Sequence, residues 1–211
     1  MSYFVTGATG FIGRFLMEKL LARRGTVYVL ARKASKGKVE ELKERFPEHA
    51  ARIVPVWGDL TKAKLGISAE QMAEMKGKIK HLFHLAAVYD LSADAASQEA
   101  ANIDGTRNTV EFADAIKAGI FHHTSSIAAA GLYSGMFRED MFEEAENLDH
   151  PYFRTKHDSE GIVRKECNRP FRIYRPAMVV GHSKTGEIDK IDGPYYFFTL
   201  LKRMRQILPP W

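Results

Sequence analysis

The sequence predicts an α/β fold built on a doubly wound parallel sheet with helices on both faces. Short, strand-like apolar runs alternate with segments of helical periodicity along the chain, which is typical of right-handed βαβ units. The strand-like runs are continuously apolar, as expected for strands buried on both faces. A glycine-rich segment separates the first strand from the first helix. With 211 residues, 45% of them hydrophobic, the chain is long enough to bury a sizeable core.

The elements follow one another in a regular order. We expect strands at residues 3–6, 26–31, 52–57, 81–87, 120–125 and 171–174. Helical patterns occupy residues 11–23, 38–45, 69–75, 93–118, 151–167 and 195–208. Gly105 weakens the fourth helix without ending it, and Pro151 suits the first turn of the fifth. Two long non-periodic segments, 128–149 and 181–193, follow carboxyl ends of strands, where open α/β sheets bind ligands.

Composition excludes several classes of protein. The 31 basic and 26 acidic residues give a net charge of +5 and are spread along the chain, so nucleic acid is not an expected partner. The single cysteine, Cys167, cannot form an internal disulfide, and a reducing compartment fits it best. The sequence has no apolar run of membrane-spanning length and no signal peptide, so a cytoplasmic location is expected. No metal site is predicted.

The glycine-rich segment at residues 6–13 predicts a dinucleotide-binding loop. Gly7 permits a tight turn, Gly10 lets the backbone approach a pyrophosphate, and Gly13 allows close packing of helix on sheet. The amides at the start of the following helix then face the phosphates. The alternative is a simple helix-entry turn. The expected cofactor contacts in this segment are Thr6, Gly7, Thr9, Gly10, Phe11, Ile12 and Gly13.

Basic residues favour NADPH/NADP+ over the unphosphorylated cofactor. NAD-specific sites usually place an acidic residue after the second strand, but here Arg32 stands 19 residues after Gly13. An arginine fork suits a 2′-phosphate, and Arg14 and Ser35 are expected to contribute nearby. The alternative is ordinary surface charge. After the third strand, Asp59 and Leu60 are expected near the adenine, although a plain Asp turn is the competing interpretation.

Tyr152 and Lys156 predict a reaction centre. They lie four residues apart on one helix face, so the ammonium group can lower the pKa of the phenol from its ordinary value near ~10. The phenol could then exchange a proton with a carbonyl. Hydroxyls at Ser125 and Ser126 end the fifth strand and could polarise that carbonyl. Asn102 could anchor a water relay to Lys156, or could be an exposed helical residue.

These motifs together resemble the extended short-chain dehydrogenases/reductases, which have a Rossmann-like fold. Three further segments carry the resemblance: His84-Leu85-Ala86-Ala87, Ser125-Ser126-Ile127-Ala128-Ala129-Ala130-Gly131 and Arg175-Pro176-Ala177-Met178-Val179-Val180-Gly181. The resemblance implies cofactor contacts at Ala86, Ala87, Pro176, Tyr152 and Lys156. It implies a catalytic serine at Ser126, five residues before Gly131, with Ser125 as the second choice.

Within that family, the sequence looks most like the fatty acyl-CoA and thioester reductases, especially the N-terminal reductase of bacterial two-domain enzymes. Segments 84–90, 137–142 and 193–198 carry this narrower likeness. It implies NADPH-dependent reduction of long-chain acyl thioesters or fatty aldehydes toward alcohols, with a second reductase domain as partner. The three alanines at 128–130 and Ala177 depart from the residues that many relatives have there.

The resemblance also implies an organisation in two parts. Residues 1–185 would form the NADP(H)-binding domain with the catalytic residues, and residues 186–211 would begin a truncated substrate-binding region. The aromatic and basic segment at 195–205 could alternatively touch a membrane surface.

Two other functions are compatible with the pattern. A nucleotide-sugar epimerase or dehydratase of the same fold would normally hold NAD, which Arg32 disfavours. A non-catalytic NADP-binding sensor would commonly lack the Tyr–Lys pair, which is intact here.

Overall fold

A computed structural model describes residues 1–87, 95–188 and 194–207 of the chain. It divides into two compact units, Met1–Pro176 and Ala177–Trp211, and this division falls before the predicted boundary at residue 185. The first unit contains a six-stranded sheet in the order β3-β2-β1-β4-β5-β6, with every neighbouring pair parallel. The strands are β1 (Ser2–Thr6), β2 (Val27–Ala31), β3 (Ile53–Trp57), β4 (Ile79–His84), β5 (Ile120–Thr124) and β6 (Phe171–Tyr174).

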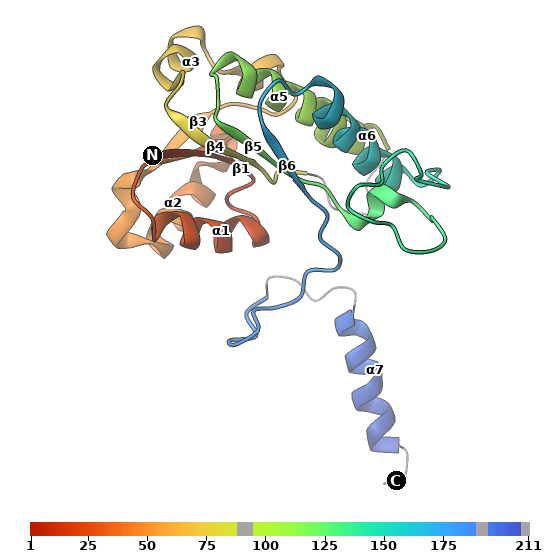
Figure 1. Cartoon of the computed structure of the whole chain (residues 1–211). Helices are drawn as coiled ribbons and strands as arrows, with labels where there is room; N and C mark the ends of the chain where they lie inside the picture. The colour runs from red at the N-terminus through yellow and green to blue at the C-terminus, as the bar shows by residue number, and fades with distance from the viewer. Residues whose placement is uncertain (88–94, 189–193, 208–211) are drawn as a thin grey trace. The chain divides into compact units, whose positions relative to one another are not determined.

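Helices cover both faces of this sheet, as Figure 1 shows, with α1 and α2 on one face and α3, α5 and α6 on the other. The predicted doubly wound α/β architecture is therefore confirmed. The helices of the first unit are α1 (Phe11–Leu21), α2 (Lys36–Arg45), α3 (Ala69–Met75), α4 (Ala95–Gln98), α5 (Gly105–Ala115) and α6 (Pro151–Glu166). Short 3₁₀ turns lie at Lys33–Ser35, Pro47–Arg52, Ala63–Gly66 and Ile127–Ala130, and a π-helix at Glu99–Asp104.

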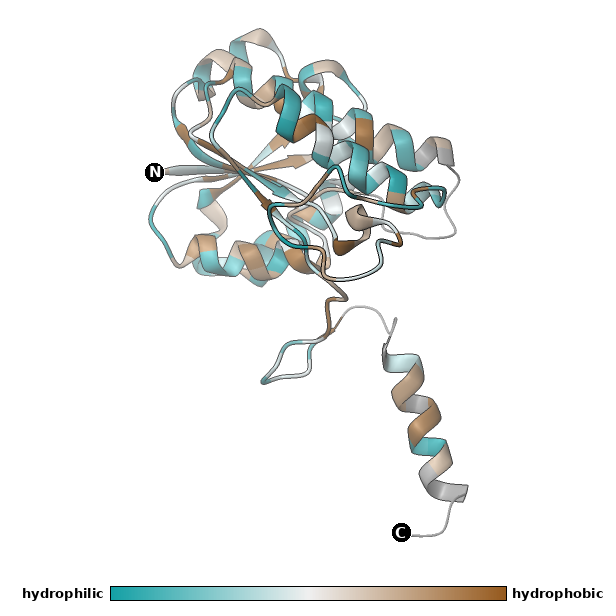
Figure 2. Cartoon of the chain, turned by 45° about the vertical axis from the view of Figure 1, so that its right-hand side comes forward, coloured by the Kyte–Doolittle hydropathy of each residue, from teal (hydrophilic) through white to brown (hydrophobic). Residues whose placement is uncertain are grey.

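Each face of the sheet has its own apolar core. Alternate residues along β1 point to opposite faces, so Phe4 packs toward α5 and α6 while Val5 packs toward α1 and α2. In Figure 2, brown and teal segments alternate along the helices, as expected for helices that bury one side against a sheet. The central strand β1 is buried over Tyr3–Thr6, as its apolar run predicts, whereas the edge strand β6 is largely exposed.

The strand order reverses between β1 and β4. β1 pairs with β2 on one side and with β4 on the other, so the loops after β1 and β4 diverge to opposite faces. In open α/β sheets the crevice at such a reversal, outside the carboxyl ends of the strands, is where ligands bind. The glycine-rich loop lies at this point.

Most predicted elements differ from the structure by one or two residues at their ends, and two differ more. The fourth strand, expected at 81–87, runs from Ile79 to His84, because the amides of Leu85 and Ala86 bond to the Thr6 hydroxyl and the chain leaves the sheet there. The predicted helix at 93–118 is divided into α4, the π-helix and α5, and it ends before Lys117, whose φ is 52°. Its first two residues lie outside the described ranges.

The second unit holds the helix α7 (Pro194–Ile207), which is close to the predicted helix at 195–208. The last residue of that predicted helix lies outside the described ranges. Within this unit the Tyr195 hydroxyl accepts a hydrogen bond of 2.7 Å from the Gly181 amide. Exposed apolar side chains along α7 include Tyr196, Phe197 and Phe198. In the described part of the chain, no helix combines the length and apolarity needed to cross a bilayer.

Candidate active site

The glycine-rich loop owes its shape to close backbone contacts. Gly7 has a φ of +72°, and a Cβ there would lie 2.7 Å from the Ala86 amide nitrogen, so the loop passes directly over the end of β4. A Cβ on Gly13 would lie 2.1 Å from the Gly7 carbonyl oxygen. Gly13 was predicted to bring helix and sheet together, but its closest contact is with the loop itself. Gly10, the N-cap of α1, lines the pocket described below, so this helix begins at the crevice, where an anion is favoured.

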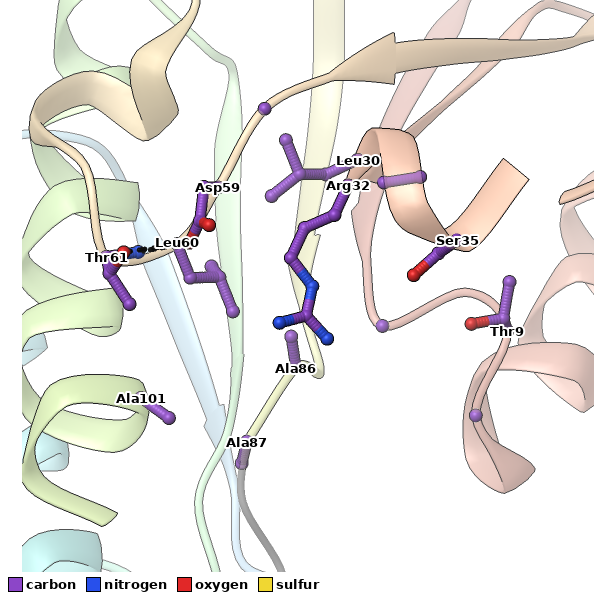
Figure 3. A pocket seen from close by; sticks show the side chains of 14 residues that line it. Thr9, Leu30, Arg32, Ser35, Asp59, Leu60, Thr61, Ala86, Ala87 and Ala101 are labelled. Atoms are coloured by element: carbon purple, nitrogen blue, oxygen red, sulfur yellow. Dashed lines mark hydrogen bonds between the residues drawn. The ribbon is translucent and has the colours of Figure 1, made fainter. Parts of the chain in front are cut away.

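An open pocket of about 370 Å³ adjoins this loop at the carboxyl ends of β1 to β4 (Figure 3). Nine of the predicted cofactor residues line it: Gly7, Thr9, Gly10, Arg32, Ser35, Asp59, Leu60, Ala86 and Ala87. Figure 3 shows the Arg32 side chain reaching into the space between Asp59 and Leu60 on one side and Ser35 and Thr9 on the other. These residues are widely separated in the sequence, and the parallel sheet brings them together.

Five further residues line the pocket that sequence reasoning did not select: Leu30, Ala31, Gly58, Thr61 and Ala101. Three of them, Ala31, Gly58 and Thr61, directly adjoin selected residues at the ends of β2 and β3, and Leu30 precedes Ala31, so the strand-end signal could have identified these four. Ala101 comes from the π-helix and has no comparable signal.

Arg14 lies beside a second, smaller depression of about 290 Å³. Thr9 lines both depressions, so they meet at the loop. The other lining residues come from α2 and are mostly charged: Lys38, Glu41, Leu42 and Arg45. Positively charged side chains therefore flank the loop on two sides: Arg32 after β2, and Lys38 and Arg45 on α2.

Asp59 is held as a carboxylate. Its Oδ1 accepts hydrogen bonds of 2.9 Å from both the amide and the hydroxyl of Thr61. The hydrogen bond from the Thr61 backbone amide, assisted by the bond from the Thr61 hydroxyl and by the charge of Arg32, keeps the pKa of Asp59 below its usual value. Asp59 therefore forms an Asp turn and also lines the pocket, so the two interpretations of this residue are compatible.

Several predicted cofactor residues do not line this pocket, namely Thr6, Phe11, Ile12, Gly13, Tyr152, Lys156 and Pro176. Thr6 is fully buried, and its hydroxyl bonds to His84 Nδ1 at 2.8 Å and to two amides after β4. The Thr6 side chain thus holds the segment that follows β4, whose Ala86 lines the pocket. Pro176 follows β6, and its carbonyl accepts from the Ile127 amide at 3.1 Å, beside the serine segment.

Tyr152 and Ser126 meet at the carboxyl end of β5. Pro151 opens α6, and the amide of Tyr152 donates to His150 Nδ1 at 3.1 Å, which caps the helix. The Tyr152 hydroxyl then lies 3.5 Å from Ser126 Oγ. Two hydroxyls from different elements converge on one point, as a site that binds a carbonyl oxygen requires.

The two serines have different partners. Ser125 is buried, and its Oγ donates to Glu160 Oε2 at 2.8 Å. Ser126 Oγ faces Tyr152 and accepts from the Ala128 amide at 3.1 Å. The geometry therefore brings Ser126, the first choice from sequence, against the tyrosine.

Lys156 lies one helical turn after Tyr152 and is buried. Its Nζ donates to the Thr124 carbonyl at 3.0 Å. Burial lowers the pKa of Lys156 to about 8, and the Glu160 carboxylate acts in the opposite direction. The ammonium form therefore predominates at neutral pH, beside the end of β5, two residues before Ser126.

Asn102 is buried at 2% exposure, so the exposed-residue interpretation is wrong. It sits in the π-helix, a rare turn that is frequent at functional sites. Its Nδ2 donates to Thr155 Oγ1 at 3.3 Å, and Thr155 Oγ1 donates to the Tyr152 carbonyl at 3.2 Å. Asn102 thus contacts α6, the helix that carries Tyr152, through Thr155.

The same chain of bonds continues to the glycine-rich loop. Thr106 Oγ1 donates to the Asn102 carbonyl at 2.6 Å, so it accepts from His84 Nε2, which lies 3.1 Å away. His84 Nδ1 therefore accepts from Thr6, which assigns the Nε2–H tautomer. Burial lowers the pKa of His84 to about 3, so this imidazole stays neutral at neutral pH. Hydrogen bonds thus link the start of the glycine-rich loop to α6.

The strand order, the glycine-rich loop and the Ser–Tyr–Lys arrangement define an extended short-chain dehydrogenase/reductase with a nicotinamide dinucleotide site. The chain belongs to the Male sterility protein family, which it matches over residues 5–210. The match covers both units, so the family assignment concerns nearly the whole sequence.

Known proteins similar to this chain include large peptide synthetases and a fatty acyl-CoA reductase. The terminal R domain of the myxalamid PKS-NRPS pathway superimposes with a TM-score of 0.82 and 29% identity, over 96% of this chain and 55% of that domain. The non-canonical nonribosomal peptide synthetase FrzA of a Cladobotryum species is 31% identical over 90% of this chain and 20% of its own length. Fatty acyl-CoA reductase wat of Drosophila melanogaster is 28% identical over 90% of this chain and 46% of its own length. The chain therefore spans only part of each relative's length.

Proposed function

We propose that this chain is the catalytic, NADPH-binding part of a reductase that acts on long-chain acyl thioesters, on the derived aldehydes, or on both. One observation carries the proposal. Ser126 and Tyr152 converge at the carboxyl end of β5, with Lys156 one turn further along α6. This is the same edge of the sheet as the dinucleotide pocket. Similarity to a fatty acyl-CoA reductase and to the R domain of a synthetase supports the substrate class.

The residues present fit a phosphorylated dinucleotide. Gly7 and Gly13 leave no room for a side chain in the loop, so the backbone can approach a pyrophosphate. Arg32 reaches into the pocket, and Arg14 lies beside the adjoining depression. Their guanidinium groups suit a 2′-phosphate, and the ionised Asp59 suits an amino group such as that of adenine.

NADPH supplies a hydride when bound. The side chains of this chain hold the carbonyl oxygen, donate a proton to it and stabilise the charge that forms. Ser126 and Tyr152 hold the carbonyl oxygen of the substrate by hydrogen bonds. Tyr152 gives its hydroxyl proton to that oxygen as negative charge develops on it. The ammonium group of Lys156 stabilises the phenolate that remains. With a thioester, breakdown of the reduced adduct releases the thiol and an aldehyde.

The 2′-phosphate contact can be tested by replacing Arg32 with alanine. We expect the Kd for NADPH to rise about 10- to 100-fold, because a charge-assisted hydrogen-bond pair is lost, while the Kd for NADH changes less than about twofold. Arg24→Ala, which removes an exposed arginine before β2, is the matched control. Calorimetric titration with both cofactors measures the effect. Equal affinity of the native chain for NADH and NADPH would contradict the proposal and favour sugar-modifying relatives.

The pH dependence of turnover follows from Lys156. The ammonium form is present below its pKa of about 8 and is lost as pH rises through that value. We therefore expect kcat for aldehyde reduction to be steady at neutral pH and to fall about tenfold per unit at high pH, with an apparent pKa of about 8. In a Lys156→Arg variant, whose charge persists, this falling limb should move to higher pH. A profile that stays flat to about pH 10 in the native chain would exclude the role of Lys156.

A further inference from the structure

Glu160 is a buried carboxylate that the proposed chemistry does not use. It lies on α6 one turn after Lys156 and two turns after Tyr152, so the three side chains share one face of the helix. Its exposure is 0%, and it accepts hydrogen bonds from three side chains. These are Ser125 at 2.8 Å, Arg164 at 2.8 Å and Arg175, which binds both oxygens at 2.6 and 3.0 Å.

Arg175 extends this cluster to the loop that follows the serine segment. Besides its two bonds to Glu160, its guanidinium donates to the carbonyl of Arg138 at 3.1 Å and to that of Met141 at 2.6 Å. It also lies over the Phe137 ring, with 5.0 Å between its Cζ atom and the ring centroid. One arginine at the end of β6 therefore fixes two backbone points of the 138–141 loop.

The same loop is held a second time against α6. The Phe142 ring stacks on His157 with centroids 4.3 Å apart, and the Arg164 guanidinium lies 4.8 Å from the Phe142 centroid. Gly161 leaves space for this ring, since a Cβ there would lie 3.2 Å from Phe142 Cζ. The loop is thus docked on the helix that carries Tyr152, at the level of Glu160.

We propose that Glu160 is a positioning residue, which fixes Ser126 opposite Tyr152 through Ser125 and fixes the 138–141 loop through Arg175. The proposal rests on the proposed function, because it concerns the placement of the carbonyl-binding hydroxyls. Ser125 and Ser126 are adjacent, so a bond that holds the Ser125 side chain also limits how far the Ser126 backbone can move. Hydrogen bonds from two arginines and a serine keep the carboxylate ionised: burial would raise the pKa of Glu160, but these bonds outweigh it.

Ser125→Ala tests the link to Ser126 most gently, because it removes one hydroxyl and leaves the Glu160–Arg175 pair intact. We expect kcat for aldehyde or acyl-CoA reduction to fall about tenfold, with the KM for NADPH unchanged within about twofold. Ser125→Thr restores the hydroxyl and should recover most of kcat. The matched control is Thr109→Val, which removes a buried hydroxyl that donates to the Gly105 carbonyl in α5. Native kcat in Ser125→Ala would overturn the proposal.

Amide hydrogen exchange provides a readout that does not depend on turnover. In Glu160→Gln and in the charge-balanced Glu160→Gln/Arg175→Gln double variant, we expect exchange at the Ile127 and Ala128 amides to rise at least about tenfold. Both amides are bonded in the native chain, to the Pro176 carbonyl and to Ser126 Oγ. Exchange in β1 and β2 should stay unchanged. Unchanged exchange at 127–128, or an equal rise across the whole sheet, would overturn the proposal.

The two measurements separate this proposal from the proposed function. If the native chain binds NADPH but reduces neither thioester nor aldehyde, the function is wrong, and hydrogen exchange still decides whether Glu160 orders the serine segment. If the native chain turns over and Ser125→Ala does so equally well, the function stands and the positioning role fails.

Discussion

Replacing Tyr152 with phenylalanine should lower kcat for aldehyde or acyl-CoA reduction by about 10²- to 10⁴-fold, the range expected for loss of a general acid. The variant loses only the hydroxyl that faces Ser126 at 3.5 Å, so the helix and its packing should persist. The Kd for NADPH should change less than about threefold, because the pocket beside the glycine-rich loop does not include this side chain. Steady-state kinetics and calorimetry on the same preparation measure both effects.

The control for this experiment is Tyr28→Phe, which removes a phenol from β2, on the far side of β1 from Tyr152. It should leave kcat within about twofold of the native value. Native turnover in Tyr152→Phe would show that another group donates the proton, and the assignment of the reaction centre would then be wrong.

Replacing Gly13 with alanine should abolish nucleotide binding and destabilise the domain. The added Cβ would lie 2.1 Å from the Gly7 carbonyl oxygen and 2.8 Å from two backbone atoms of Ala8, so the backbone of the loop must move. We expect the Kd for NADPH to rise at least about 100-fold. Overpacking of this kind typically costs about 1–3 kcal/mol of unfolding free energy.

Gly37→Ala is the matched control for Gly13→Ala. Gly37 lies in α2, and a Cβ there would meet nothing within 4 Å. Because alanine favours helix over glycine, this variant should be more stable by about 0.5–1 kcal/mol and should bind NADPH normally. If Gly13→Ala bound NADPH as tightly as Gly37→Ala, the loop would not be the pyrophosphate site.

The sequence was sufficient to predict the fold and much of the candidate site. The alternation of apolar strands and helices led to the parallel sheet, and the positions of Arg32 and Asp59 after successive strands placed both in one pocket. The structure brings these residues together because a parallel sheet gathers all carboxyl strand ends at one edge, whereas their contact with a cofactor stays a prediction.

Other features depend on tertiary contacts that no local pattern reveals. The early end of β4 is set by the Thr6 hydroxyl, which captures two amides that lie 79 and 80 residues further along the chain. The burial of Asn102 depends on a π-helix that a periodicity of about 3.6 residues does not predict. Glu160 looks like a surface residue of a charged helix, and only the fold places Arg175 against it.

The most direct test of the proposed function is consumption of NADPH by the native chain in the presence of a long-chain acyl-CoA or fatty aldehyde, compared with Tyr152→Phe. We expect substrate-dependent oxidation of NADPH, with formation of the aldehyde or alcohol, that is nearly lost in the variant. Tight binding of NADPH with no turnover of either substrate would contradict the proposed function and would indicate a cofactor-binding protein without reductase activity.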